Sequence, residues 1–149
     1  MKIYIAADHA GFELKKQVVE ALQADGIEDL GPFSTDSVDY PDYANLVCRQ
    51  IPLSNGTDAN LSSFGILICG SGQGMALRAN KFSHIRAALV YNDEIVKLSR
   101  EHNNANVICI GSRLVDLQTA LRWIQIFKET AFSGGRHQTR VAKVSWPVT

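Results

Sequence analysis

The sequence predicts an α/β fold in which a five-stranded parallel sheet is covered by helices on both faces. Five short apolar runs alternate with amphipathic stretches along the 149 residues, which is the pattern of successive βαβ units. The runs are continuously apolar, as strands buried on both sides require. The sequence shows no internal repeat and no interdomain linker. We therefore expect residues 1–149 to form one domain with a single core.

The first half of the chain predicts two strands and two helices. Residues 3–7 form the first apolar run, and apolar side chains then recur at helical spacing from Phe12 until Gly26. Residues 27–30 predict a short second strand, which is followed by a polar loop. Pro41 suits the first turn of a helix, and the apolar side of that helix continues to Ile51.

The second half predicts three strand–helix units. Residues 53–63, rich in Ser, Asn and Gly, precede them and predict a surface loop. The units pair strand 64–68 with helix 75–81, strand 85–90 with helix 93–101, and strand 107–110 with a long helix from about 116 to 131. Gly134-Gly135 separates the last helix from a short basic tail.

The charge balance argues against nucleic acid or a membrane as a partner. The chain has 15 basic and 15 acidic residues and no basic run. No apolar stretch approaches the roughly 20 residues that span a bilayer. Residues 1–5 enter a strand at once and lack the form of a signal peptide. We therefore expect a cytoplasmic protein.

The three cysteines, Cys48, Cys69 and Cys109, are odd in number and widely spaced. They form neither a disulfide framework nor a CxxC metal pair, and the sequence offers no compact set of metal ligands, so we expect no metal. Cys48 lies on a predicted helix, and Cys109 lies between two isoleucines in a predicted strand. Both are expected to be small buried core residues.

Cys69 differs because it ends an apolar run immediately before a glycine loop, residues 70–74 (GSGQG). In open parallel sheets, ligands bind just beyond the carboxyl ends of the strands, and the N–H groups of such a loop can hold an anion. A thiol at this point can act as a base or a nucleophile. The same N–H groups favour the thiolate and suit a reaction that develops negative charge on oxygen.

The loop fails three phosphate-binding or nucleotide-binding patterns. A Walker loop needs Lys and then Ser or Thr after its last glycine, but Met75 and Ala76 follow Gly74. In a GxGxxG fingerprint the third glycine would fall on Met75 or Leu77. A cysteine phosphatase loop would place Arg six residues after Cys69, where Met75 stands. We therefore expect no nucleotide cofactor.

Further candidates follow the ends of other predicted elements. Asp8-His9 follows the first strand, His102-Asn103 ends a helix, and residues 111–113 (GSR) end the last strand. Arg136 and Arg140 are four residues apart, so a helical tail would place both guanidinium groups on one face. Such a pair can clamp a phosphate, although it can also be an ordinary solvated helix face.

Several candidates also have a purely structural interpretation. Asp8 could cap a helix, and His102 could stabilise a helix carboxyl end, where a cation is favoured. Cys69, taken alone, could be a small buried residue. His84 and His137 are expected to lie on the surface or behind the site.

Six short motifs are distributed in order along nearly the whole chain. They are residues 8–12 (DHAGF), residues 39–44 (DYPDYA), the Cys69 loop with residues 79–81 (ANK), residues 102–106 (HNNAN), residues 111–113 (GSR) and residues 134–137 (GGRH). Together they resemble ribose-5-phosphate isomerase type B, a family that includes the galactose-6-phosphate isomerase subunits. The resemblance implies a three-layer Rossmann-like sandwich, consistent with the predicted parallel sheet.

The resemblance implies a cofactor-independent aldose–ketose isomerase that interconverts ribose 5-phosphate and ribulose 5-phosphate in the non-oxidative pentose phosphate pathway. Cys69 would move a proton between C1 and C2 of the open-chain sugar through a cis-enediol. His102 would open the furanose ring by proton transfer at the ring oxygen. The enediolate oxygen would be held by backbone N–H groups of the loop, namely Gly70, Ser71, Gly72, Gln73 and Gly74.

The resemblance also implies binding roles and a partner. Asp8 and Asn103 would bind sugar hydroxyls, and Asp39 and Tyr40 would line the sugar pocket. The groups that hold the phosphate would be His9, Arg113, Arg136 and Arg140. The active site would lie at the interface of a homodimer, alone or paired into a tetramer, with some groups supplied by the partner subunit.

Two departures and two alternatives accompany the resemblance. One branch of the family uses a glutamate at the position of Met75, which cannot act as a base here, so the base falls to Cys69. Residues 53–63 are longer than the usual family connection. The substrate could instead be a six-carbon sugar phosphate, such as allose or galactose 6-phosphate. A non-catalytic sugar-phosphate-binding module is disfavoured because both Cys69 and His102 are present.

Overall fold

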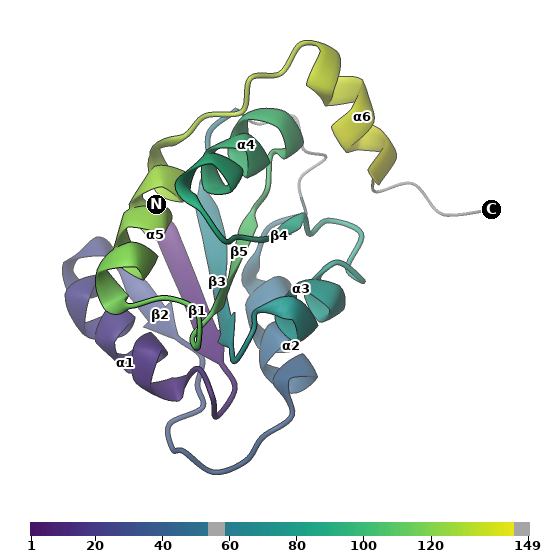
Figure 1. Cartoon of the computed structure of the whole chain (residues 1–149). Coiled ribbons are helices and arrows are strands. Elements are labelled where there is room, and N and C mark those ends of the chain that lie inside the picture. The colour runs from purple at the N-terminus through teal and green to yellow at the C-terminus, as the bar shows by residue number, and fades with distance from the viewer. Residues whose placement is uncertain (54–58, 145–149) are drawn as a thin grey trace.

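The computed structural model describes residues 1–53 and 59–144, and in it five parallel strands form one sheet (Figure 1). The strands are β1 (Lys2–Ala7), β2 (Ile27–Asp29), β3 (Ser63–Cys69), β4 (Ala87–Leu89) and β5 (Val107–Gly111). Their order across the sheet is β2-β1-β3-β5-β4. The parallel α/β fold predicted from the sequence is therefore confirmed, and the strand order, which the pattern did not reveal, is now known.

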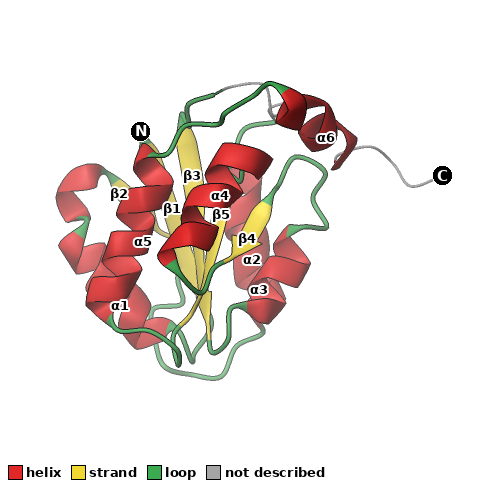
Figure 2. Ribbon diagram, turned by 45° about the horizontal axis from the view of Figure 1, so that its top comes forward, coloured by secondary structure: helices red, strands yellow, loops and turns green. Residues whose placement is uncertain are grey.

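Helices cover both faces of the sheet, so the fold has three layers (Figure 2). One face carries α1 (Phe12–Ala21), α4 (Asp93–Asn103) and α5 (Leu117–Glu129), and the other carries α2 (Tyr40–Gln50) and α3 (Gln73–Ala79). A short 3₁₀ helix, η1 (Gln23–Asp25), follows α1, and α6 (Arg136–Val144) ends the described chain. Within residues 1–53 and 59–144, no helix has the length and apolarity needed to cross a bilayer.

The alternation of side chains along each strand divides the core in two. Phe64, Ile66 and Ile68 of β3 pack toward α1, α4 and α5. Leu67 and Cys69 point the other way and pack toward α2 and α3. Because successive side chains of a strand face opposite sides of the sheet, Cys69 emerges on the α2/α3 face, at the carboxyl end of the central strand.

The two outer strands differ from the sequence prediction. All residues of β2 and β4 are only half-buried, so continuous burial holds for β3, β5 and, from Ile3 onward, β1. The strand predicted over 85–90 narrows to Ala87–Leu89. Asn side chains explain its late start, because Asn106 Oδ1 accepts the Arg86 N–H at 2.8 Å and Asn80 Oδ1 accepts the Ala87 N–H at 2.9 Å. At this edge of the sheet, the two Asn side chains accept backbone N–H groups that a neighbouring strand would otherwise bind.

Two further predictions concern segments outside the sheet. The basic tail forms a helix, α6, as the placement of Arg136 and Arg140 on one face required. The predicted surface loop 53–63 ends one residue early, because Ser63 is buried and begins β3. Residues 54–58 of that loop lie outside the described residues.

Candidate active site

Three loops meet at the carboxyl edge of the sheet and enclose a pocket of about 220 Å³. They follow β1, β3 and β5, which are neighbours in the sheet. The pocket is lined by Asp8, His9, Ala10, Tyr40, Cys69, Gly70, Ser71, Gly74 and Arg113. Seven of these nine residues are candidates from the catalytic and binding sets expected above; Tyr40 was expected only as a lining residue and Ala10 was not expected.

Glycines let these loops approach one another. A Cβ on Gly11 would lie 2.5 Å from the Ile68 carbonyl oxygen, and one on Gly111 would lie 2.8 Å from the backbone of Ser71. Ser112 Oγ donates to the Ala10 carbonyl oxygen at 2.9 Å. Backbone therefore packs on backbone around the pocket, which fixes the positions of its polar groups.

Cys69 is nearly buried, with 5% of its surface exposed at the pocket. Its Sγ accepts the Gly72 N–H at 3.1 Å, so the loop fixes the position of the sulfur at the pocket. Gly72 has φ of +78°, a left-handed conformation that suits glycine. The loop thus places the donor through a turn that other residues rarely adopt.

The other two thiols lie in apolar surroundings. Burial raises the pKa of Cys48 to about 12, and burial also raises the pKa of Cys109 well above its ordinary value. Both side chains are fully buried in the α2/α3 half of the core. The prediction that they are core residues is confirmed, and both remain protonated near neutral pH.

The glycine loop contributes fewer free donors than predicted. Gly70, Ser71 and Gly74 line the pocket, whereas Gly72 and Gln73 do not. The Gly72 N–H is engaged by Cys69 Sγ, and the Gln73 N–H by Ser71 Oγ at 3.3 Å. In this structure the turn therefore uses two of the five N–H groups internally, and the binding role of all five stays a prediction.

Asp8 and His9 form one wall of the pocket. Asp8 is 8% exposed, and its Oδ1 accepts the Gly11 N–H at 2.9 Å. It caps the turn before α1, but the N-cap position itself is Gly11. His9 Nδ1 accepts the Val38 N–H at 3.3 Å, which leaves Nε2 as the donor of the neutral ring.

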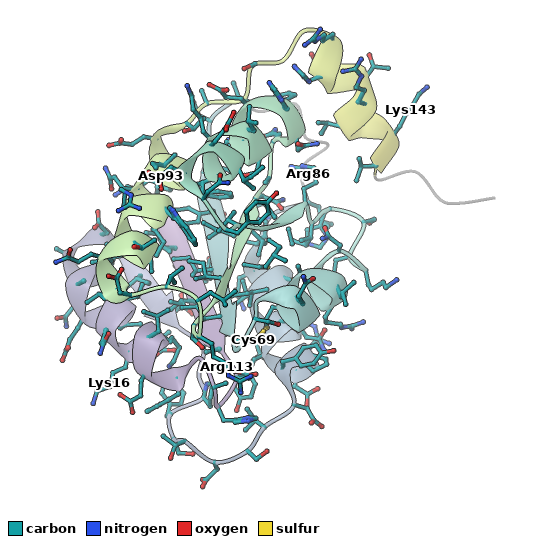
Figure 3. All side chains as sticks on the ribbon, in the orientation of Figure 1. Lys16, Cys69, Arg86, Asp93, Arg113 and Lys143 are labelled. Carbon is teal, nitrogen blue, oxygen red and sulfur yellow. The ribbon has the colours of Figure 1, made fainter. Side chains whose placement is uncertain are left out.

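Arg113 forms the opposite wall of the pocket, and its guanidinium supplies a positive charge there. A Cβ on Gly70 would lie 3.0 Å from its Cζ, so the guanidinium rests directly against the glycine loop. Figure 3 shows Cys69 and Arg113 close together at one end of the molecule. A guanidinium fork beside backbone donors suits a phosphate or another oxyanion.

The remaining candidates lie at the amino edge of the sheet. His102 and Asn103 end α4, which runs back from the carboxyl edge, and Arg136 and Arg140 lie on α6. In Figure 1, α6 and the end of α4 lie at the far side of the sheet from the loop between β3 and α3. The candidates on α4 and α6 are therefore separated from the pocket by about the length of one strand, in which each residue extends roughly 3.3 Å.

His102 has a neighbour that the sequence did not single out. Its ring stacks on His137, with ring centroids 4.2 Å apart and planes within 9° of parallel. His137 was expected to be a surface residue or to lie behind the site. Its contact needs the packing of α6 on α4, and the only signal in the sequence was its place between Arg136 and Arg140.

The structure therefore sorts the predicted site into two half-sites. We call Asp8, His9, Cys69, Gly70, Ser71, Gly74 and Arg113 the carboxyl-edge half-site. We call His102, Asn103, Arg136, Arg140 and the added His137 the amino-edge half-site. Among the described residues, no group of three or more His, Cys, Asp or Glu side chains is arranged to hold a metal ion.

A thiol, backbone donors and a guanidinium at the carboxyl edge of a parallel α/β sheet are suited to proton transfer on a small anionic substrate. The chain belongs to the ribose/galactose isomerase family, whose model matches residues 3–144, and it is an isomerase. Ribose-5-phosphate isomerase B of Escherichia coli K12 is 39% identical over 146 residues, covering 97% of this chain and 94% of the relative. The probable ribose-5-phosphate isomerase B of Mycoplasma pneumoniae is 43% identical over 145 residues, covering 95% and 91%.

Solved structures show the same fold. A ribose 5-phosphate isomerase from Thermotoga maritima matches with a TM-score of 0.87 at 45% identity, covering 97% of both chains. Ribose-5-phosphate isomerase B from Mycoplasma genitalium, solved with bound ribulose-5-phosphate, matches with a TM-score of 0.87 at 40% identity. That match covers 97% of this chain and 93% of the other. The three-layer Rossmann-like fold that the sequence resemblance implied is confirmed.

Proposed function

We propose that this protein interconverts ribose 5-phosphate and ribulose 5-phosphate, with Cys69 as the base. The observation that carries the proposal is the thiol at the pocket wall, with the Gly72 N–H 3.1 Å from its sulfur. The Mycoplasma genitalium relative, which has the same fold, binds ribulose-5-phosphate.

The separation of the half-sites supports a shared active site in a homodimer. A pentose phosphate is too small to contact Cys69 and His102 of one chain across the length of a strand. In a two-fold dimer, each chain can present its amino-edge half-site to the carboxyl-edge half-site of its partner, which makes two equivalent sites. Arg113 would then come from one subunit, and Arg136 and Arg140 from the other.

Ring opening would be the first step. His102 of the partner subunit donates a proton to the ring oxygen O4 as the C1–O4 bond breaks. The O1–H proton passes to water, C1 becomes the carbonyl carbon of the aldehyde, and O4 becomes a hydroxyl. Asn103 of the same subunit lies next to His102 at the end of α4 and binds a sugar hydroxyl.

Proton transfer between carbons follows. The Cys69 thiolate takes the C2 proton, and the electron pair moves through C1–C2 onto O1 to give the cis-enediolate. Backbone N–H groups of Gly70, Ser71 and Gly74, which line the pocket, stabilise that oxyanion. The thiol then returns its proton to C1, and C2 becomes the carbonyl carbon. Asp8, through its second oxygen, can carry the O2–H proton to O1.

The cations would hold the phosphate. Arg113 lies against the glycine loop, and His9 lines the same pocket. Arg136 and Arg140 are exposed and lie on one face of α6. Three guanidinium groups around one dianion provide binding that is the same in the ground state and the transition state, so it lowers KM without changing kcat.

The roles of Cys69 and His102 can be tested separately in D₂O. Deuterium uptake at C1 of ribulose 5-phosphate needs the base but no ring opening. We expect Cys69→Ala to abolish both deuterium uptake and isomerisation, by about 10³-fold or more, while substrate still binds. We expect His102→Asn to slow isomerisation of ribose 5-phosphate and to keep deuterium uptake.

The controls define what would contradict the proposal. Cys48→Ala removes a buried thiol that does not line the pocket and should keep wild-type rates. Normal turnover by Cys69→Ala would refute the base assignment. A higher kcat/KM for allose 6-phosphate or galactose 6-phosphate than for ribose 5-phosphate would refute the named substrate and favour a six-carbon sugar.

A further inference from the structure

The stacked pair of histidines is a feature that the proposed mechanism does not use. His102 lies in the last turn of α4 and His137 in the first turn of α6. Their centroids are 4.2 Å apart and their planes differ by 9°, so the two rings are in full face-to-face contact. Both residues are half-buried. His137 therefore covers one face of the His102 ring, and the ring nitrogens of His102 lie at the edge of that ring.

The position of His137 is fixed by contacts around it. The Ser133 N–H donates to the Glu101 carbonyl oxygen at 3.0 Å, which ties the segment before α6 to the end of α4. Gly134 and Gly135, with φ of +62° and +54°, then turn the chain. Val141 of α6 is 2% exposed and anchors the helix. The stack therefore follows from the docking of α6 and is not a contact between two free side chains.

The charges around the pair disfavour a proton on His137. Burial and the positive charges of His102, Arg136 and Arg140 lower the pKa of His137 below its ordinary value. Two protonated rings at 4.2 Å would repel each other. The other charged groups on the two helices near the pair are Lys97, which pairs with Glu101 at 3.5 Å, together with Arg100 and Lys143.

We propose that His137 is a positioning residue for ring opening: its stacked ring holds the His102 imidazole in the plane from which it delivers a proton to O4. This inference rests on the proposed function and assigns no reacting atom to His137. The proton still leaves His102, the C1–O4 bond still breaks, and the O1–H proton still passes to water. What His137 contributes is a fixed orientation of the donor, which general acid catalysis requires.

The decisive comparison uses a substrate that needs no ring opening. The 4-deoxy analogue of ribose 5-phosphate lacks O4 and cannot form the furanose. We expect His137→Ala to lower kcat for ribose 5-phosphate about tenfold, which is part of the 10²–10⁴-fold that a general acid supplies. Turnover of the 4-deoxy analogue, and deuterium uptake into ribulose 5-phosphate, should stay near wild type.

A second variant tests the physical basis of the effect. His137→Phe keeps a planar ring without a titratable group, so it should restore most of the ribose 5-phosphate kcat that alanine loses. Gln138→Ala, an exposed neighbour on α6, is the matched control and should behave as wild type. If the alanine variant does not fold, His137→Gln, which lacks a ring, replaces it in the comparison with phenylalanine.

Four results would overturn the inference. They are an unchanged kcat in His137→Ala, an equal loss on ribose 5-phosphate and the 4-deoxy analogue, a rise in KM alone, and a phenylalanine variant as slow as alanine. The outcome for His102→Asn separates this inference from the proposed function. If that variant retains full activity on ribose 5-phosphate, the ring-opening role of His102 is wrong and the inference falls with it. If it is slow but His137→Ala is not, only the inference is wrong.

Discussion

The two half-sites are built in different ways. At the carboxyl edge, the loops after β1, β3 and β5 pack backbone against backbone, and Gly11 and Gly111 leave no room for a Cβ. At the amino edge, the candidate groups are side chains on the ends of α4 and the face of α6. The first half-site is fixed by the sheet itself. The second depends on how one terminal helix docks, so the two should respond differently to mutation.

The difference matches the chemistry assigned to each half. Stabilising an enediolate needs donors placed within a few tenths of an ångström, which rigid backbone provides. Holding a phosphate tolerates longer side chains, because guanidinium groups can adjust their reach. The comparison therefore predicts large effects from small backbone changes at the carboxyl edge and graded effects from removal of the phosphate-binding arginines at the amino edge.

The largest effect is expected from Gly72→Ala. The residue has φ of +78°, and its Cβ would lie 2.6 Å from Leu89 Cδ1 and 3.1 Å from the Ile110 carbonyl carbon. Strain and overpacking should lower the free energy of unfolding by about 2 to 4 kcal/mol, and displacement of the N–H bound to Cys69 should remove most activity. Urea unfolding and steady-state kinetics measure both.

Gly26→Ala is the matched control for that prediction. Gly26 has nearly the same φ, +76°, but no atom lies within 4 Å of the added Cβ. Its cost should be only about 1 kcal/mol, with normal kcat and KM. Equal destabilisation by the two substitutions would show that close packing around Gly72 adds nothing to the destabilisation caused by Gly72→Ala.

An intermediate effect is expected from Arg136→Ala at the amino edge. Loss of one charge-assisted hydrogen bond to phosphate, about 1.5 to 3 kcal/mol, should raise KM by about tenfold or more, with kcat nearly unchanged. The side chain is exposed, so stability should not change. Initial rates over a range of ribose 5-phosphate concentrations test this, and an unchanged KM would remove Arg136 from the phosphate site.

The smallest effect is expected from Lys16→Ala on α1. Lys16 is exposed and belongs to neither half-site, and Figure 3 shows it pointing away from the molecule. Its removal should leave KM within the error of the wild-type value, because an exposed charge is well screened by salt. A rise in KM like that of Arg136→Ala would mean that general positive charge, and not a placed clamp, binds the substrate.

Local sequence patterns predicted the carboxyl-edge half-site well. Cys69 ends an apolar run and a glycine loop follows it, so strand, turn and site can be recognised within ten residues. Asp8 and Arg113 follow strands in the same way, and the carboxyl ends of parallel strands share one edge. The sequence signal for each of these residues is local, and the parallel sheet then brings the residues together at one edge.

The rest depended on contacts between distant segments. The short β4 results from the side chains of Asn80 and Asn106, which no local pattern reveals. The helix α6 has Val141 as its buried residue and therefore lacks an apolar stripe. The separation of Arg113 from Arg136 follows from the path of α5, which carries the chain from the end of β5 to α6, and the stack on His102 follows from the docking of α6.

The shared site is the central claim, and mixing two variants that are each impaired in one half-site tests it most directly. Cys69→Ala damages the carboxyl-edge half-site, and His102→Asn damages the amino-edge half-site. After the two variants are unfolded and refolded together, half of the dimers contain one subunit of each kind. If sites form between subunits, each mixed dimer has one intact site, and about a quarter of wild-type activity should return. If mixed dimers are shown to form but the mixture is no more active than the two variants alone, the two half-sites do not meet across a subunit interface.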